Sequence, residues 1–137
     1  MNAKLGASVA VVGLFLYVTH GHHLPRLPAV TTAAHVRGGT LGCAGLERLW
    51  EQAGGSRGAA FTAAEIAMAE SSGRQYAVNA NGGRSTDRGY WQVNSVHGPL
   101  STYDAYGNAR SAVLISHDGR DWSPWVTFQT RAYEGKC

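Results

Sequence analysis

The sequence predicts one α+β domain that is mostly helical and contains a small β-hairpin or sheet. Apolar residues recur at helical spacing in two separate stretches, residues 46–53 and residues 108–117. Between them, residues 79–83 are rich in the turn formers Asn and Gly, and residues 89–94 alternate small or apolar with polar side chains. The chain has 137 residues, enough for one domain and not comfortably enough for two.

Charged residues are few and unevenly placed. Apolar residues make up 44% and charged residues 15% of the chain, which excludes a coiled coil and a charge-driven disordered chain. The formal net charge is +3, but Lys4, Arg26 and Arg37 precede position 47, so 12 basic residues less these three leave nine against nine acidic ones. Residues 41–137 are therefore neutral, without a basic stripe, and the sequence predicts no nucleic-acid partner.

The N-terminus is typical of an export signal. Residues 5–18 follow Lys4 and run for 14 positions without a charge, fewer than the roughly 20 apolar residues that span a bilayer. We interpret residues 1–18 as a signal peptide or a short membrane anchor, rather than as a buried helix. Small residues suited to cleavage, Thr32 and Ala34, lie far from this run, so whether the segment is cleaved stays open.

Residues 19–40 are predicted to be a linker, because polar and small residues surround Pro25 and Pro28. The folded domain then covers residues 41–137. The linker contains three candidate metal ligands, His20, His22 and His23. No carboxylate or cysteine lies near them in the sequence, and histidines are common in flexible linkers, so we predict no metal site.

The two cysteines stand at the ends of the predicted domain, Cys43 at its start and Cys137 at the last position. In an exported protein, an even number of cysteines predicts one disulfide, which here would join the ends of the domain. Two free, buried thiols are the alternative, and they become the better interpretation if the protein stays in the cytosol.

Capping signals predict two further helices. Thr62 and Glu65 have the spacing of a capping box, and they predict a helix over residues 63–72. Phe61 and Ile66 would form its hydrophobic staple, and Gly73 would end it. Near the C-terminus, Ser123 as N-cap and Pro124 at the first helical position predict a short last helix.

Glu70 stands out on the helix predicted over residues 63–72. It shares one helical face with Ala63, Ile66 and Ala67, so its carboxyl group should lose hydration and its pKa should rise. Cleavage of a glycosidic bond needs such a group to protonate the leaving oxygen. The alternative is a glutamate near a helix end that simply reaches solvent.

A second carboxylate, Asp87, follows 17 residues later among turn-forming residues, where it should be hydrated and ionised. A buried acid and a polar carboxylate that face each other across a cleft form the pair used in glycoside hydrolysis. The alternative is that Asp87 only closes a turn, as Asp often does near Gly.

Three segments resemble the active-site regions of the lysozyme superfamily. Residues 67–71 (AMAES) are similar to the Glu-Ser segment of lytic transglycosylases, and residues 85–95 (STDRGYWQVNS) resemble a string of C-type lysozymes at much the same distance from the Glu. Residues 118–125 (DGRDWSPW) resemble the region where a Trp packs on the acidic Glu. The resemblance covers about residues 41–133 and is closest to small lysozyme-like domains of phages and bacterial cell-wall enzymes.

The resemblance implies a lysozyme-like fold with a hairpin that lines the cleft, and it assigns roles to individual residues. Glu70 becomes the general acid and Asp87 the candidate second carboxylate. Gln92 and Asn94 become hydrogen-bonding residues of the cleft wall, and Trp122 a hydrophobic partner of Glu70.

The alternation of residues 89–94 adds its own expectation. Gly89, Trp91 and Val93 share one face, which we interpret as core. The polar face then carries Tyr90 with Gln92 and Asn94, so Tyr90 is predicted to contact substrate. Asp87 has the parity of the core face, so a bend near Gly89 must turn it into the cleft.

The resemblance implies an enzyme that cleaves the β-1,4 bond between N-acetylmuramic acid and N-acetylglucosamine in peptidoglycan. We expect it to be exported, because of its N-terminal segment, to be a monomer and to need no cofactor. Both a muramidase and a lytic transglycosylase stay open, because lytic transglycosylases do without a second carboxylate. The enzyme would act at the cell wall, free or tethered through residues 5–18, or as part of a virion if a phage encodes it. A non-catalytic glycan-binding or structural domain of a phage tail or a secretion or conjugation apparatus is the alternative.

Overall fold

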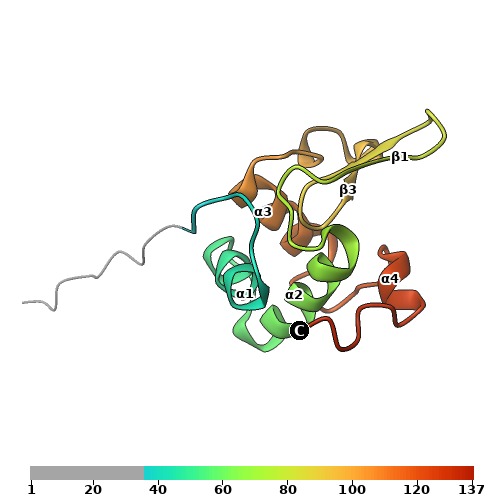
Figure 1. Cartoon of the computed structure of the whole chain (residues 1–137). Coiled ribbons are helices and arrows are strands. Elements are labelled where there is room, and N and C mark those ends of the chain that lie inside the picture. Colours follow the sequence, from blue (N-terminus) through green and yellow to red (C-terminus); the bar gives the residue numbers. More distant parts are fainter. Residues whose placement is uncertain (1–35) are drawn as a thin grey trace, which may run out of the picture. The chain divides into compact units, whose positions relative to one another are not determined.

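The computed structural model describes residues 36–137 (Figure 1). The predicted signal peptide or anchor, most of the predicted linker and the three linker histidines lie outside the described residues. The elements of the described chain follow in the order α1 Cys43–Gln52, α2 Arg57–Ser71, β1 Val78–Ala80, β2 Thr86–Arg88, β3 Val93–Asn94, the 3-10 helix η1 Ser95–Leu100, α3 Ala105–Ile115 and α4 Val126–Gln129.

The architecture is α+β and mostly helical, which confirms the predicted fold class. The strands form one antiparallel sheet in the order β1-β2-β3, so the predicted hairpin is present and gains a third strand. In Figure 1 the sheet lies above α2 and α4. Within residues 36–137, no helix is long and apolar enough to span a bilayer.

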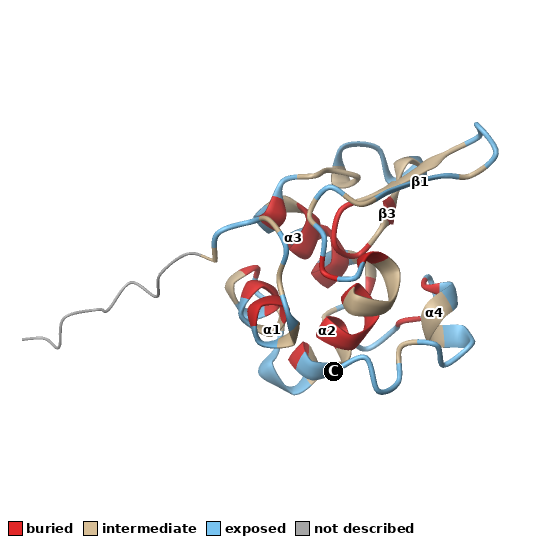
Figure 2. Cartoon of the chain, viewed as in Figure 1, coloured by how far each residue is buried: buried red, intermediate tan, exposed pale blue. Residues whose placement is uncertain are grey.

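Small side chains let the helices pack closely around a cluster of tryptophans. Figure 2 shows buried residues gathered on the inward faces of α1, α2 and α3, where alanines such as Ala63, Ala67 and Ala109 are fully buried. The periodicity predicted for the first helix is confirmed, because its four apolar positions are at most 1% exposed; they are Leu46, Leu49, Trp50 and Ala53. Such tight contacts are characteristic of alanine-rich helix interfaces.

The four tryptophans of the chain form a closed cluster. Ring centroids lie 6.3 Å apart for Trp50 and Trp91, 5.4 Å for Trp50 and Trp122, and 5.1 Å for Trp122 and Trp125. The indole Nε1–H of Trp125 donates to the carbonyl oxygen of Trp91 over 2.8 Å and closes the cluster. The cluster joins α1 to the segments that precede β3 and α4.

Helix α2 begins earlier than the capping box predicts. Its N-cap is Ser56, whose N–H donates to Asp118 Oδ1 and whose carbonyl oxygen accepts from the Trp50 indole, so tertiary contacts fix the start. Thr62 and Glu65 lie inside the helix, and the capping-box prediction is wrong. Glu65 is buried and accepts a hydrogen bond from the N–H of Gly135, and the predicted staple residue Phe61 is 53% exposed.

The last two helices also differ from their predicted starts. Helix α3 begins at Ala105 rather than near residue 108, because the Asp104 side chain caps it by accepting from the N–H of Gly107. Helix α4 begins after Trp125, and Ser123 and Pro124 form a turn before it. Trp125 follows this turn, and its indole donates a buried hydrogen bond to the Trp91 carbonyl oxygen.

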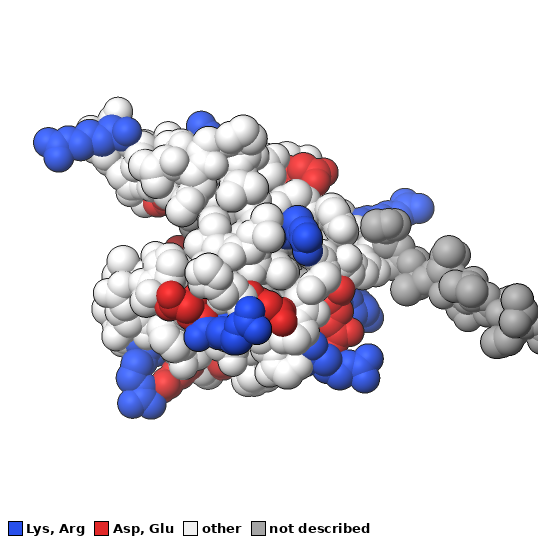
Figure 3. Space-filling model, turned by 180° about the vertical axis from the view of Figure 1, so that it is seen from behind, with Lys and Arg blue, Asp and Glu red and all other residues white. Residues whose placement is uncertain are grey.

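Surface charges are mixed. Figure 3 shows Lys and Arg side chains interspersed with Asp and Glu, and this face carries no basic stripe over the described residues. Two ion pairs of the described chain, Arg57–Glu51 and Arg131–Glu134, are solvent-exposed, so each contributes little to stability.

Residues 36–40, which composition assigns to the linker, contact the folded domain. The N–H of Gly39 donates to Gln75 Oε1 at 2.6 Å, and its carbonyl oxygen accepts from the buried Tyr90 hydroxyl at 2.8 Å. The N–H of Val36 donates to Gln52 Oε1. These contacts indicate that the folded part begins before residue 41.

We predict that a protein beginning at Leu41 is less stable than one beginning at Val36. Removal of Gly39 leaves the buried Tyr90 hydroxyl and the Gln75 side chain without these partners, which costs roughly 1–3 kcal/mol per unsatisfied group. Urea unfolding of both proteins measures the difference. Equal transition midpoints would show that residues 36–40 contribute nothing.

Cys43 and Cys137 form a disulfide, and their Cα atoms lie 5.7 Å apart, a usual separation. We predict that this bond is present in the native protein and that its loss costs about 4–5 kcal/mol at most, because it closes a loop of 94 residues. Peptide mapping without reductant should find the cross-linked peptide. Two thiols that are freely alkylated in the native protein would contradict this prediction.

Candidate active site

Glu70 lies one residue before the end of α2, on the face that the sequence predicts to be apolar. Ala63, Ile66 and Ala67 on this face are fully buried, and Glu70 at its end is half-buried. The Thr127 hydroxyl donates a hydrogen bond to Glu70 Oε1 at 2.6 Å. The helix therefore buries the stem of the glutamate and presents its carboxyl group at the surface of a cleft.

The surroundings of Glu70 favour its protonated form. Burial raises the pKa of Glu70 above its ordinary value. The hydrogen bond from the Thr127 side chain lowers this pKa, the negative charge of Asp87 raises it, and a hydrogen bond from the Thr127 backbone lowers it. Burial is the largest of these effects, so Glu70 keeps its proton to higher pH than an exposed glutamate does.

Asp87 lies at the centre of a row of side chains across the sheet. It pairs with Asn79 on β1 and with Asn94 on β3, so the three side chains share one face. Its oxygens accept from the amides of Asn94 at 2.6 Å, Asn81 at 2.9 Å and Asn79 at 3.3 Å. Three amide donors thus hold the carboxylate in one orientation.

A bend at Gly89 follows the strand of Asp87, as the sequence predicts. Gly89 has a φ of +80°, and a Cβ atom there would lie 2.4 Å from Cγ of Asn108. The buried Asn108 side chain donates to the Arg88 carbonyl oxygen and accepts from the N–H of Trp91. The bend therefore needs both the left-handed conformation and the missing side chain of glycine.

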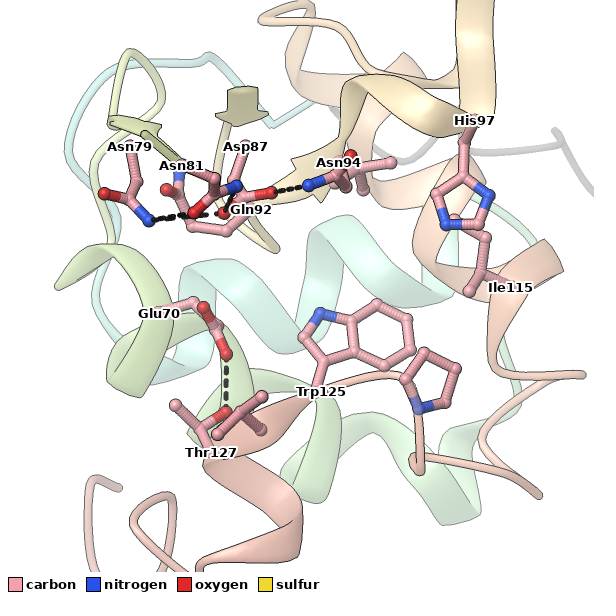
Figure 4. A pocket seen from close by; sticks show the side chains of 13 residues that line it. Glu70, Asn79, Asn81, Asp87, Gln92, Asn94, His97, Ile115, Trp125 and Thr127 are labelled. Atoms are coloured by element: carbon pink, nitrogen blue, oxygen red, sulfur yellow. Dashed lines mark hydrogen bonds between the residues drawn. The ribbon is translucent and has the colours of Figure 1, made fainter. Parts of the chain in front are cut away.

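Glu70 and Asp87 line opposite sides of one cleft of about 420 Å³. Figure 4 shows Glu70 on the helical side and Asp87 with its asparagines on the sheet side. The residues that line this cleft are Glu70, Asn79, Asn81, Asp87, Gln92, Val93, Asn94, His97, Ile115, Pro124, Trp125, Val126 and Thr127.

Gln92 and Asn94 lie in the cleft wall, where the sequence predicts them. Gln92 has a φ of +46°, and its side-chain amide donates to the carbonyl oxygens of Ala77 and Gly89. Asn94 donates to Asp87 and accepts from the N–H of Val96. Both amides are held by the protein itself, which fixes the polar wall of the cleft.

Tyr90 does not lie in the cleft, and its prediction as a substrate-contacting residue is corrected. Its side chain is fully buried, its hydroxyl binds the Gly39 carbonyl oxygen, and burial raises its pKa to about 12. Strict alternation fails because Gly89 and Gln92 both have positive φ, so residues 89–92 form a turn rather than a strand. Trp91 and Val93 are buried as predicted.

Trp122 is also corrected. It is 4% exposed, packs between Trp50 and Trp125 and does not line the cleft. Trp125 occupies the place that the sequence predicts for Trp122, because the Trp125 ring lines the cleft beside Glu70 (Figure 4). The two tryptophans are three positions apart in the sequence, and the turn between them directs Trp125 rather than Trp122 to the cleft.

Four polar residues of the cleft lie outside the set that the sequence predicts. The sequence predicts Asn79 and Asn81 only as turn formers, whereas in the structure Asn79 on β1 and Asn81 just after it both donate to Asp87. Thr127 and His97 carry no local sequence signal for a cleft, since each reaches it through the fold. No group of acidic, histidine or cysteine side chains among residues 36–137 could hold a metal ion.

The cleft therefore brings a carboxyl group with a raised pKa together with a second, hydrogen-bonded carboxylate. This is the arrangement that enzymes use to cleave glycosidic bonds. A protein-family model described as a lysozyme-like domain matches residues 47–127, more than half of the chain, and the match includes both carboxylates.

The chain belongs to the lysozyme-like domains, a family of glycosidases and lytic transglycosylases that act on peptidoglycan. This membership implies peptidoglycan as the substrate and confirms the resemblance inferred from the sequence. No curated protein and no solved structure matches the chain.

We predict that Glu70→Gln is as stable as the wild type or more stable near pH 7, and that the difference shrinks in acid. The folded state binds the Glu70 proton more tightly than the unfolded chain, whose pKa is about 4.3. The stability that this proton contributes is present below the unfolded pKa and is lost as pH rises through the folded pKa. Melting temperatures from pH 3 to pH 8 test this sign, and a wild type that is more stable than the variant at pH 7 would contradict it.

Proposed function

We propose that the protein cleaves the β-1,4 bond between N-acetylmuramic acid and N-acetylglucosamine, with Glu70 as the general acid. The observation that carries this proposal is that Glu70, with its raised pKa, and Asp87, held by three amides, line one cleft. Family membership supports the substrate class. The bond and the residue roles are inferences from this geometry.

The first step transfers the Glu70 proton to the glycosidic oxygen as the bond to the anomeric carbon breaks. The sugar at the break develops positive charge, which the Asp87 carboxylate stabilises or captures. The sheet-side amides keep Asp87 directed into the cleft, because they occupy its oxygens from the side of the sheet. Glu70, now ionised, can then accept a proton from the incoming nucleophile.

The nucleophile decides between two outcomes. Water gives a muramidase reaction, whereas the 6-hydroxyl of the muramic acid gives a 1,6-anhydro end and thus a lytic transglycosylase reaction. The position of Asp87 in the cleft opposite Glu70 favours the muramidase, since a carboxylate kept only for structure would not need to line the cleft. The 1,6-anhydro product is lighter than the hydrolysis product by one water.

We also propose that the protein is exported and acts as a monomer at the cell wall, free or tethered through residues 5–18. The charge-free run after Lys4 supports export. The disulfide between Cys43 and Cys137 fits an oxidising compartment.

We predict that Glu70→Gln lowers cleavage of purified sacculi by about 10²- to 10⁴-fold, because Gln keeps the acceptor for Thr127 and cannot donate a proton. In a muramidase, Asp87→Asn should cause a comparable loss, and in a lytic transglycosylase only a mild one. Turbidity assays measure the rates, and mass spectrometry of the products identifies the nucleophile.

Thr130→Val, on an exposed residue outside the cleft, is the control and should leave the rate unchanged. An active Glu70→Gln enzyme would refute the assignment of the acid. A wild type that clears no cell-wall zymogram would instead favour a non-catalytic glycan-binding domain.

A further inference from the structure

The two oxygens of the Glu70 carboxyl group lie in different surroundings. Oε1 accepts a hydrogen bond of 2.6 Å from the Thr127 hydroxyl. Figure 4 shows this bond on the side of α4, whereas the other oxygen points toward the sheet side that carries Asp87 and Gln92. One side of the carboxyl is therefore bound by the protein, and the other faces the cleft.

We propose that Thr127 is a positioning residue that makes Oε2 the oxygen from which Glu70 donates its proton. This inference rests on the proposed role of Glu70 as the general acid. A protonated carboxyl group carries one O–H donor, and its remaining oxygen accepts. Because Thr127 donates to Oε1, the proton belongs on Oε2, the oxygen on the side of the cleft where a substrate would lie.

The position of Thr127 is itself held by the core. It follows Trp125 by two residues, and the Trp125 indole is anchored to the Trp91 carbonyl oxygen at 2.8 Å. Helix α4 packs against α2, the helix that carries Glu70. The donor thus lies just after a buried anchor, Trp125, on a helix that contacts the helix of the acceptor.

Thr127 also limits how far the pKa of Glu70 rises. A hydrogen bond to the charged form of a carboxyl group stabilises that form, so Thr127 opposes the effect of burial. The other titratable groups of the cleft are Asp87 and His97, and α4 carries none. Removing the hydroxyl should therefore both loosen the carboxyl group and raise its pKa further.

Thr127→Val tests this proposal, since valine keeps the branched shape and lacks the donor. The alkaline limb of its pH–rate profile should move to higher pH, and kcat should fall roughly 10- to 100-fold at an unchanged KM, because the proton donor is no longer oriented. Thr127→Ser keeps a hydroxyl and should restore both the limb and kcat.

Thr130→Val is the matched control. It also removes a threonine hydroxyl near α4, but this hydroxyl donates only to backbone carbonyl oxygens. This variant should keep the kcat of the wild type and the alkaline limb of its pH–rate profile. If Thr127→Val does not fold, Thr127→Ala replaces it.

Carbon-13 NMR of the Glu70 carboxyl, assigned by its absence in Glu70→Gln, reads the pKa without turnover. A Thr127→Val enzyme with the wild-type limb and the wild-type Glu70 titration would overturn the proposal, as would a Thr127→Ser enzyme that behaves like Thr127→Val. Both outcomes differ from failure of the proposed function, which appears as an active Glu70→Gln enzyme.

Discussion

One buried hydrogen bond, from the Trp125 indole to the Trp91 carbonyl oxygen, joins the two chain segments that carry the two sides of the cleft. Trp91 follows the strand that carries Asp87, and Trp125 precedes the threonine that contacts Glu70. Both tryptophans are nearly fully buried and pack through the other two onto α1. The geometry of the cleft is therefore a property of the core, and a change in core packing would alter it.

Much of the fold could be predicted because its signals are local. The spacing of apolar residues predicts α1 and most of α3, and the run of Asn and Gly predicts the hairpin. The start of α2 could not be predicted, because tertiary contacts fix Ser56. Asp118 is distant from it in the sequence, and Trp50 belongs to helix α1. A plausible capping box then gave a start that lies inside the real helix.

The residues of the candidate site also fall into those that the sequence predicts and those that only the fold places. Helical spacing placed Glu70 on the buried face of its helix, and the resemblance to lysozymes paired it with Asp87 across what the structure shows to be one cleft. Tyr90 and Trp122 were misplaced because each lies near a turn, where a shift of the chain direction changes which side chain reaches the cleft. Thr127 has no sequence signal, since its contact to Glu70 spans 57 positions.

One of the three asparagines that hold Asp87 is in a sequence context prone to deamidation. Asn81 donates to Asp87 at 2.9 Å and is followed by Gly82, which has no side chain to hinder attack of its backbone nitrogen on the amide carbon once the hydrogen bond from the Gly82 N–H to the Ala80 carbonyl oxygen opens. Deamidation through this succinimide route would replace the donor with a carboxylate or an isoaspartate. Two acceptors of like charge would then face each other beside the sheet. Chemical ageing of the protein would thus alter one of the three amides that hold Asp87 in place, without unfolding the domain.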